Sequence, residues 1–384
     1  MAKSMNRILI TGGAGFIGSN LAHKLTDKGY DVIVLDNLSE QIHGKNPEID
    51  SPLYLSLLSN NKVKFIKGCV TSSLDWQIAL EDVDAVIHLA AETGTGQSMY
   101  EIVKYVDMNI KGTSIMLDLL TNKQHKVKKI IIAASRAIYG EGRYKCSVHG
   151  KIYPSERKEF DMNKGDFECK CPICNSELEL LPTDEESKIH PTSIYGITKQ
   201  NQEQMVLLVG KSLGIDVVSF RYQNVYGPGQ SLKNPYTGIL SIFSTQIKNG
   251  NNINIFEDGL ESRDFVYIDD VVNATILGLE TPEATNQAFN VGFGKPITVN
   301  TVAKTLRKNF NSKVKINCNG NYRIGDIRHN YADISRANRV LGYIPQVSFD
   351  VGIARFCSWV NTQSVQKDNY TKSIEEMKCK GLYK

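Results

Sequence analysis

The most constraining stretch of this sequence is the apolar run of residues 7–11 and the glycine-rich turn that follows it. The run predicts a buried parallel strand, and the turn passes directly into a helical pattern. Gly12, Gly15 and Gly18 permit a tight turn, a close approach of backbone to a pyrophosphate, and close packing of helix on strand. The start of that helix offers free N–H groups and partial positive charge to phosphates. The stretch therefore predicts a dinucleotide-binding fold.

A carboxylate stands where such a fold needs one. The next apolar run, residues 31–35, ends at Asp36, where a carboxylate accepts both hydroxyls of an adenosine ribose. Asp36 repels a 2′-phosphate, and neither Asn37 nor Leu38 is an arginine that would bind one. The sequence therefore favours NAD over NADP.

Apolar runs and helical patterns alternate through the first part of the chain, with helices beginning near Gly15, Ser73 and Gln97. We expect strands over residues 7–11, 31–35, 63–67, 85–89, 129–134 and 216–220. Continuously apolar runs fit a sheet that is covered on both faces. The pattern predicts an α/β fold with a doubly wound parallel sheet, a Rossmann fold, and a smaller mixed α/β lobe that binds substrate.

The sequence suggests a division into domains. We expect an NAD-binding domain over residues 1–226, interrupted by a cysteine-rich insertion over residues 142–182. Residues 227–364 form mainly the substrate-binding lobe, with some crossing back, and residues 365–384 are a polar, loosely attached tail. Residues 40–61 exceed a usual connection and predict a flap over the site.

Composition excludes some function classes. The net charge of +4 is too small to argue for nucleic acid as a partner. No apolar run approaches the length of a membrane-spanning helix, and the first residues do not resemble a signal peptide. We therefore expect a cytoplasmic protein that binds neither nucleic acid nor membrane.

The insertion contains a cluster of cysteines. Cys146-x2-His149 and Cys171-x2-Cys174 are two short chelating pairs with the spacing of a structural zinc ribbon. A closed tetrahedral site would stabilise an excursion too small for a core of its own. Cys169 is a fifth candidate that could replace His149. The alternative is a set of reduced thiols without metal.

Tyr195 and Lys199 stand four residues apart, so a helix places both on one face. A phenol with a pKa near 10 is a poor base, but a nearby ammonium and a nicotinamide cation favour the phenolate. Ser135 follows a predicted strand at the end where open α/β sheets bind ligands. A Tyr-x3-Lys pair is also common on helix surfaces. Behind a dinucleotide fold, the three residues predict a catalytic set.

These motifs together resemble the extended short-chain dehydrogenase/reductases of the nucleotide-sugar epimerase and dehydratase group, over roughly residues 5–362. Besides the glycine turn and the catalytic set, the resemblance rests on His88-Leu89-Ala90-Ala91, Ser135 before Tyr139-Gly140, Arg221-Tyr222-Gln223-Asn224-Val225-Tyr226-Gly227-Pro228 and Arg263-Asp264-Phe265-Val266.

The resemblance implies that NAD is held through a catalytic cycle in which Tyr195 is the base and Ser135 and Lys199 assist. It implies cofactor contacts from Gly12, Gly15, Phe16, Ile17, Gly18, Asp36, Asn37, Leu89, Ala90, Ala91, Asn109, Tyr195 and Lys199. Asn109 also supports the site. The implied contacts with a nucleotide-diphosphate sugar come from Asn224, Arg263 and Arg328, with Arg136 either a further contact or a surface residue. The loop of residues 234–237 is expected to face the sugar.

The residues after Ser135 distinguish members of the group. A 4,6-dehydratase needs an acid pair there, whereas Arg136 and Ala137 follow in this chain. The catalytic set suffices for a 4-epimerase, and the motifs with the cysteine-rich insertion resemble dTDP-L-rhamnose 4-epimerase-like proteins. The alternatives are a 4,6-dehydratase that uses Glu141 or another carboxylate, a 4-ketosugar reductase, and a non-catalytic NAD-binding sensor or scaffold.

Two long helical patterns, residues 99–121 and 190–213, carry partly apolar stripes. They predict a homodimer with a four-helix interface. The alternative is that the stripes face the chain's own sheet.

Overall fold

The glycine turn lies at the centre of a large parallel sheet. The computed structural model describes residues 5–234, 236 and 238–384, and within them this sheet has the strand order β13–β9–β5–β4–β1–β2–β3. Its strands are β1 (Arg7–Thr11), β2 (Asp31–Asp36), β3 (Val63–Lys67), β4 (Ala85–His88), β5 (Lys129–Ser135), β9 (Asp216–Tyr222) and β13 (Gln287–Val291). All these strands are parallel, and the order in which they are added to the sheet reverses between β1 and β4, so the turn after β1 opens at this switch point.

The predicted strands are confirmed, with small changes at their ends. Ser135 is the last residue of β5 rather than the first residue after it. The edge strand β13 was not predicted, because it comes from the part of the chain assigned to the substrate lobe. It pairs in parallel with β9 along its whole length.

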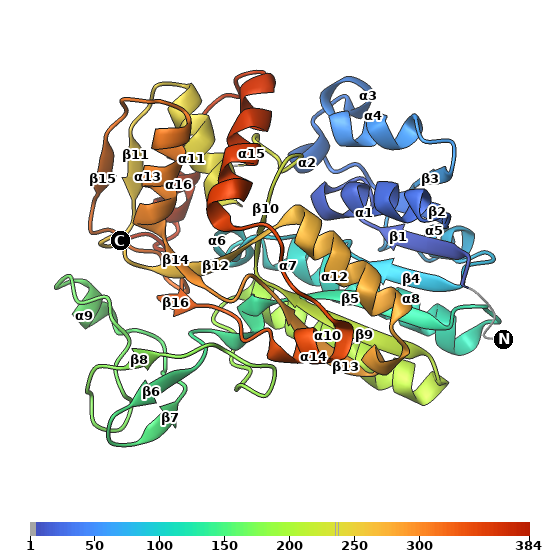
Figure 1. Cartoon of the computed structure of the whole chain (residues 1–384), viewed down its shortest axis with the longest axis horizontal. Coiled ribbons are helices and arrows are strands. Elements are labelled where there is room, and N and C mark those ends of the chain that lie inside the picture. Colours follow the sequence, from blue (N-terminus) through green and yellow to red (C-terminus); the bar gives the residue numbers. More distant parts are fainter. Residues whose placement is uncertain (1–4, 235, 237) are drawn as a thin grey trace.

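Helices cover both faces of the sheet, as a doubly wound fold requires (Figure 1). One face packs under α1 (Phe16–Asp27) and α12 (Ile268–Glu280), and the other under α5 (Ser73–Ala79), α8 (Gly112–Asn122) and α10 (Ile194–Leu213). The apolar side chains of β1 divide between the two cores: Ile8 and Ile10 join the first and Leu9 the second. This alternation explains why the strand is apolar throughout.

The helical pattern of residues 99–121 is interrupted by a π-helical turn. It comprises α7 (Ile102–Tyr105), the π turn η1 (Val106–Lys111) and α8. Such turns occur frequently at functional sites. Here η1 carries Asn109, which is fully buried and faces α10.

Short helices line the rim around the glycine turn. They are α2 (Glu40–His43), α3 (Pro47–Asp50), α4 (Pro52–Leu58), α6 (Thr95–Ser98) and the 3-10 turn η2 (Arg136–Tyr139). Pro47 and Pro52 stand at the first positions of α3 and α4, where a missing N–H costs nothing. The prolines therefore start helices in the segment that was expected to form a flap.

The smaller lobe is mixed α/β, as predicted. A small sheet contains β10 (Asn224–Tyr226), β12 (Ser262–Tyr267), β14 (Pro296–Thr298) and β16 (His329–Asn330), and a strand pair contains β11 (Ile253–Ile255) and β15 (Ile316–Cys318). The lobe's helices are α11 (Ile239–Lys248), α13 (Val299–Asn309) and α15 (Phe349–Thr362). The chain returns to the large sheet through α12, η3 (Pro282–Ala284), β13 and α14 (Ser335–Leu341).

The cysteine-rich insertion projects beside the smaller lobe, at the lower left of Figure 1. It contains a three-stranded sheet of β6 (Tyr144–Cys146), β7 (Gly150–Ile152) and β8 (Glu179–Leu180). A short helix, α9 (Glu159–Met162), lies between β7 and β8 along the chain. Its own apolar cluster is small: Cys146, Ile152 and Cys171, with Leu178 packed against them.

The expectation of a loosely attached tail is wrong. Residues 370–379 form α16 (Tyr370–Cys379), and Ile374, Met377 and Tyr383 are buried against Tyr100 and Phe256. The last residue pairs with Tyr322 through two backbone hydrogen bonds, Tyr322 N to Lys384 O at 2.8 Å and Lys384 N to Tyr322 O at 3.0 Å. The polar composition concealed one apolar face of a short helix.

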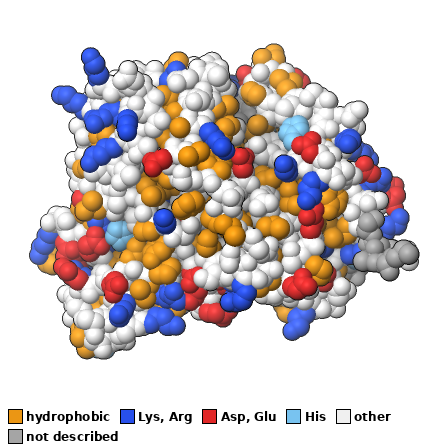
Figure 2. All heavy atoms as spheres, in the orientation of Figure 1, with side chains coloured by type: hydrophobic (Ala, Val, Ile, Leu, Met, Phe, Trp, Pro, Cys, Tyr) orange, Lys and Arg blue, Asp and Glu red, His pale blue; other side chains and the backbone are white. Residues whose placement is uncertain are grey.

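The surface carries charges of both signs. On the face shown in Figure 2, basic and acidic side chains are interspersed among apolar ones. In the described part of the chain, no helix combines the length and apolar character that crossing a membrane requires.

Candidate active site

A cavity of about 800 Å³ lies between the carboxyl ends of the central strands and the smaller lobe. Its lining includes nearly all the predicted cofactor residues: Gly12, Gly15, Phe16, Ile17, Gly18, Asp36, Asn37, Leu89, Ala90, Ala91, Tyr195 and Lys199. The rim helices α2 to α4 also line it. The site therefore assembles from segments that are far apart in the sequence.

The glycine turn has no room for side chains. Gly12 has a φ of +67°, and a Cβ there would lie 2.8 Å from the Ala90 nitrogen. A Cβ on Gly18 would lie 2.5 Å from the Gly12 carbonyl oxygen. Helix α1 begins after Gly15, so its unpaired N–H groups face the cavity at this turn. This cradle fits the pyrophosphate of NAD.

Asp36 is held in position for a ribose. Its carboxylate accepts hydrogen bonds from the backbone N–H of Ala14 at 3.0 Å and of Leu38 at 2.8 Å. Burial raises the pKa of Asp36, while His43 nearby acts in the opposite direction; the His43 Nε2 lies 3.7 Å from Asp36 Oδ1. A carboxylate has lone pairs left for further donors. His43 comes from α2, within the segment that was expected to form a flap over the site.

The three residues of the predicted catalytic set line the same cavity. Ser193 caps α10 by accepting a hydrogen bond from the Gly196 N–H at 3.1 Å, and this places Tyr195 in the first turn. Ser135 projects from the end of β5 into the same cavity. Burial raises the pKa of Tyr195, and the hydrogen bond with Ser135 and the charge of Arg136 oppose that rise.

Lys199 lies one helical turn further along α10 and is only 3% exposed. Its Nζ donates to the Ala133 carbonyl oxygen at 2.9 Å. Burial lowers the pKa of Lys199 to about 7. The amine therefore gains and loses its proton near neutral pH, which suits proton exchange with a substrate.

Asn109 supports the site from behind, which corrects its place among the cofactor contacts. It does not line the cavity. Its Nδ2 donates to Thr198 Oγ1 at 2.9 Å, and its Oδ1 accepts from the Glu92 N–H at 2.8 Å. Asn109 thus ties η1 to α10 and to the loop after β4.

His88 is a supporting residue whose role the sequence did not show. It is fully buried, with Nδ1 2.6 Å from Thr11 Oγ1 and Nε2 3.0 Å from Thr113 Oγ1. Burial and then Lys199 lower the pKa of His88 to about 3, so the ring is neutral at physiological pH. It joins β1, β4 and α8 behind the cavity.

Arg136 faces the cavity beside the catalytic set. Its Nε donates to Asn224 Oδ1 at 2.9 Å, so the two predicted substrate residues meet. No carboxylate of the described residues lies within ion-pair distance of Arg136. Burial, and then the charge of Arg263, lower the pKa of Arg136 to about 9. A cation in this state favours an anionic or hydroxyl-rich ligand.

The assignment of Arg328 to the substrate is wrong. Its side chain is fully buried away from the cavity, where it contacts Glu168, Glu257 and Asp258 at 2.5–2.8 Å. The chain's own carboxylates therefore neutralise it. Arg263 does not line the large cavity either, because its guanidinium donates to the carbonyl oxygens of residues 262, 327 and 328.

Arg323 lines the cavity instead, although it was not among the predicted site residues. Its Nε donates to Asp326 Oδ2 at 2.8 Å, and its side chain is 28% exposed. It lies in the same turn-rich segment as Arg328, so spacing could not separate them. Of residues 234–237, Pro235 and Thr237 lie outside the described residues, while Tyr236 lines the cavity and donates to Glu376 Oε2 at 2.7 Å.

The insertion brings Cys146, His149, Cys171 and Cys174 together, with all four ligand atoms within 4.8 Å of one another. Cys146 Sγ lies 3.7 Å from Cys174 Sγ and 3.5 Å from His149 Nδ1. A tetrahedral site with Zn–S bonds of about 2.3 Å requires sulfur atoms about 3.8 Å apart. Cys169 lies outside this group and is buried beside Glu141 and Tyr144.

Comparison with known proteins agrees with this architecture. A family model described as the NAD dependent epimerase/dehydratase family matches residues 8–162 and 174–292. The chain is 33% identical over 366 residues to the dTDP-L-rhamnose 4-epimerase of Burkholderia thailandensis, covering 94% of this chain and 97% of that one. It is 30% identical over 363 residues to the UDP-glucuronate 4-epimerase of Thermodesulfobacterium geofontis, covering 92% and 96%.

Solved structures show the same fold. The UDP-glucuronic acid 4-epimerase of Bacillus cereus, in complex with UDP-glucuronic acid and NAD, has a TM-score of 0.76 at 26% identity, covering 92% of this chain and 99% of that one. The UDP-glucose 4-epimerase of Thermotoga maritima with UDP-glucose has a TM-score of 0.73 at 30% identity, covering 92% and 98%. On the strength of the family match and of relatives that span nearly its whole length, the chain belongs to the NAD-dependent epimerase/dehydratase family.

Proposed function

We propose that this chain is an NAD-dependent nucleotide-sugar 4-epimerase. The observation that carries the proposal is the meeting of Ser135, Tyr195 and Lys199 in a cavity that also contains the glycine cradle and two arginines, Arg136 and Arg323. Relatives and structural neighbours that bear this name support it.

The residues perform an oxidation and its reversal at one carbon. Tyr195, as the phenolate, accepts the proton of the C4 hydroxyl, and Ser135 holds the same oxygen. NAD supplies the acceptor that takes a hydride from C4 and the donor that returns it. The flat 4-keto sugar turns over before the return, so Tyr195 gives its proton back to an oxygen of inverted configuration. Lys199 favours the phenolate when its amine is protonated.

The surroundings of Ser135 disfavour the alternatives. The dehydratase would need a carboxylate at the sugar, from Glu141 or another residue. Glu141 is 2% exposed, and its Oε2 accepts from the backbone N–H of Arg328 at 2.7 Å. It does not line the cavity and therefore does not reach the sugar. Asp36 disfavours an NADPH-linked reductase, and a complete catalytic set disfavours a mere sensor.

The two cavity arginines are the proposed contacts with the diphosphate sugar. Arg136 would bind the sugar or its phosphate while Asn224 fixes its orientation. Arg323 takes the role that was predicted for Arg328, because an arginine fork binds phosphate oxygens in pairs.

We also propose that the insertion holds a structural zinc ion through Cys146, His149, Cys171 and Cys174. The donor atoms have the spacing of a tetrahedral site, and four protein ligands leave no open position for catalysis. None of the eight cysteines, all of which lie in the described residues, forms a disulfide. Cysteines without disulfides are typical of a reducing compartment, and we propose that the protein is cytoplasmic.

We further propose a homodimer. Helices α7 and α10 lie side by side and expose apolar residues, among them Val103 at 74% and Leu208 at 69%. Ile102, Val106 and Ile197 extend this face. An exposed apolar face on two neighbouring helices fits a four-helix interface between two copies.

The proposed reaction is tested by incubating the protein with a panel of nucleotide sugars and following the products by NMR. We expect inversion at C4 without change of mass. Tyr195→Phe should reduce turnover by at least about a hundredfold and leave NAD bound, because it removes only the proton acceptor. A 4-keto-6-deoxy product, lighter by one water, would assign the chain to the dehydratases instead.

The buried Lys199 predicts a pH dependence of stability. In the folded, cofactor-free protein its pKa is about 7, against 10.5 in the unfolded chain, so between these values the unfolded chain binds one more proton. The free energy of unfolding should therefore rise by up to about 1.4 kcal/mol per pH unit in this window, a contribution that is lost as the pH falls through 7. Lys199→Met should flatten the slope of the free energy of unfolding against pH, measured by urea unfolding at a series of pH values. Equal slopes for both proteins would contradict the assignment.

Metal analysis tests the zinc proposal. The purified protein should contain about one zinc ion per chain, and Cys174→Ser should lose it because three ligands remain. Cys169→Ser is the matched control and should retain the metal. Loss of zinc from the Cys169 variant but not from the Cys174 variant, or its absence from the wild-type protein, would refute the ligand set.

The dimer is tested by light scattering. The wild-type protein should have twice the chain mass of 42.8 kDa, and a variant with Val103→Glu and Leu208→Glu should have the chain mass, because buried charge opposes association. Ile344→Glu, which changes an apolar residue exposed to 56% elsewhere, should remain dimeric. A monomeric wild-type protein would exclude the proposal.

A further inference from the structure

The segment of residues 322–328, here called the arginine loop, carries Arg323 to the cavity. It follows the strand pair β11–β15 and leads into β16. Its other end is Arg328, whose buried guanidinium anchors it. In its middle, Thr192 Oγ1 of the NAD-binding domain donates to the Gly325 carbonyl oxygen at 2.9 Å. The position of Arg323 therefore depends on what holds this loop.

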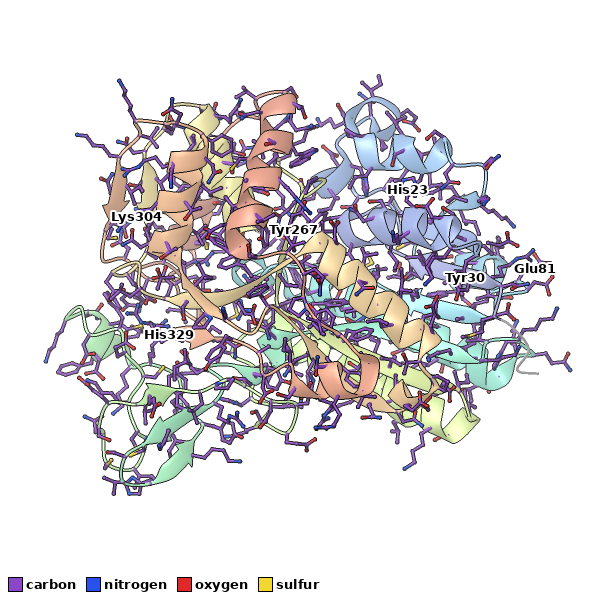
Figure 3. All side chains as sticks on the ribbon, in the orientation of Figure 1. His23, Tyr30, Glu81, Tyr267, Lys304 and His329 are labelled. Carbon is purple, nitrogen blue, oxygen red and sulfur yellow. The ribbon has the colours of Figure 1, made fainter. Side chains whose placement is uncertain are left out.

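The insertion holds the arginine loop at three places. Arg157 donates through Nη2 to the Asp326 carbonyl oxygen at 2.9 Å, and Tyr322 donates to Asn163 Oδ1 at 2.8 Å. Glu168 accepts from Arg328 Nη2 at 2.5 Å. All three insertion residues lie between the Cys146/His149 pair and the Cys171/Cys174 pair. His329, labelled in Figure 3, marks this junction, with its Nε2 3.2 Å from Glu168 Oε2.

Arg157 is the most constrained of these contacts. Its side chain is 4% exposed, and Nη1 lies 2.8 Å from Glu257 Oε1 while Nε lies 3.4 Å from Glu141 Oε1. The same Nη1 donates to the Phe167 carbonyl oxygen at 3.2 Å. Arg157 thus joins the insertion, the residue that precedes it and the smaller lobe. Breaking a buried pair of this kind leaves an unpaired charge, which is costly.

The contact at Asp326 leads directly to the cavity. Arg157 fixes the backbone of Asp326, and the side chain of Asp326 holds Arg323 through Nε at 2.8 Å and Nη2 at 2.7 Å. One charge-assisted hydrogen bond from Nε and an ion-pair contact from Nη2, both to Asp326 Oδ2, set the direction of the planar guanidinium. The orientation of Arg323 is therefore linked, through one residue, to the insertion.

We propose that Arg157 is a positioning residue: through it, the insertion holds the arginine loop so that Arg323 faces the diphosphate of the substrate. The proposal rests on the proposed function in one respect, the binding of a diphosphate at Arg323. The insertion then contributes to substrate binding, although none of its residues is proposed to contact the substrate. Arg157 itself touches neither substrate nor cofactor.

Arg157→Met tests the proposal, with Lys158→Met as the matched control because it removes the same charge from an exposed neighbour. The KM for the nucleotide sugar should rise about tenfold or more while kcat changes less than about twofold and NAD stays bound. The Kd of UDP and of dTDP, measured by calorimetry, should rise by the same factor for whichever of them binds. Amide exchange at residues 322–328 should accelerate. Arg157→Lys, which keeps the charge but loses the fork, should lie between.

Two results would overturn the proposal. One is wild-type exchange at residues 322–328 and an unchanged KM in Arg157→Met. The other is a fall in kcat and in NAD content as large as the rise in KM, which would assign Arg157 to general stability. If Arg157→Met does not fold, Asn163→Ala removes another bond to the loop without exposing a buried charge, and the same two readouts decide. If the wild-type protein binds no diphosphate and converts no sugar, the proposed function fails, while amide exchange still decides what holds the loop.

Discussion

Burial of two titratable side chains at the carboxyl end of β5 is the constraint on which the site depends. Burial raises the pKa of Tyr195 and lowers that of Lys199 to about 7, so each group alone favours its neutral form. A proton-accepting phenolate at this place therefore needs positive charge around it. Arg136 supplies positive charge to Tyr195. In the proposed reaction, protonated Lys199 and the nicotinamide of bound NAD would add to it, which would make the chemistry conditional on a loaded site.

The fold keeps this arrangement rigid by joining elements behind the cavity. Asn109 in its π-helical turn ties α10 to the loop after β4, and neutral His88 joins β1, β4 and α8. The smaller lobe is tied from the other side, where the insertion and the docked last helix both hold the arginine loop. The side chains that line the cavity are thus held in place by residues from the large sheet, the insertion and the last helix.

Sequence patterns predicted the features that depend on neighbouring residues in the chain. Apolar runs identified β1 to β5 and β9, the glycine spacing identified the cradle, and a four-residue step identified Tyr195 and Lys199. Long-range partners decided the rest. The strand β13 contains Asn290, which is tolerated in the core because it accepts from the Tyr139 hydroxyl at 2.9 Å and donates to the Thr183 carbonyl oxygen. Arg323 and Arg328 share one turn-rich segment, and only the distant carboxylates that bury Arg328 separate them.

The fate of the C4 hydrogen tests the central claim most directly. A nucleotide sugar that the protein epimerises is prepared with deuterium at C4 and converted in ordinary water, and both epimers are analysed by NMR and mass spectrometry. Because one hydride leaves and returns within the closed cavity, both epimers should retain the deuterium at C4. Replacement of the deuterium by hydrogen from water would show that C4 is inverted by proton exchange and would contradict the account.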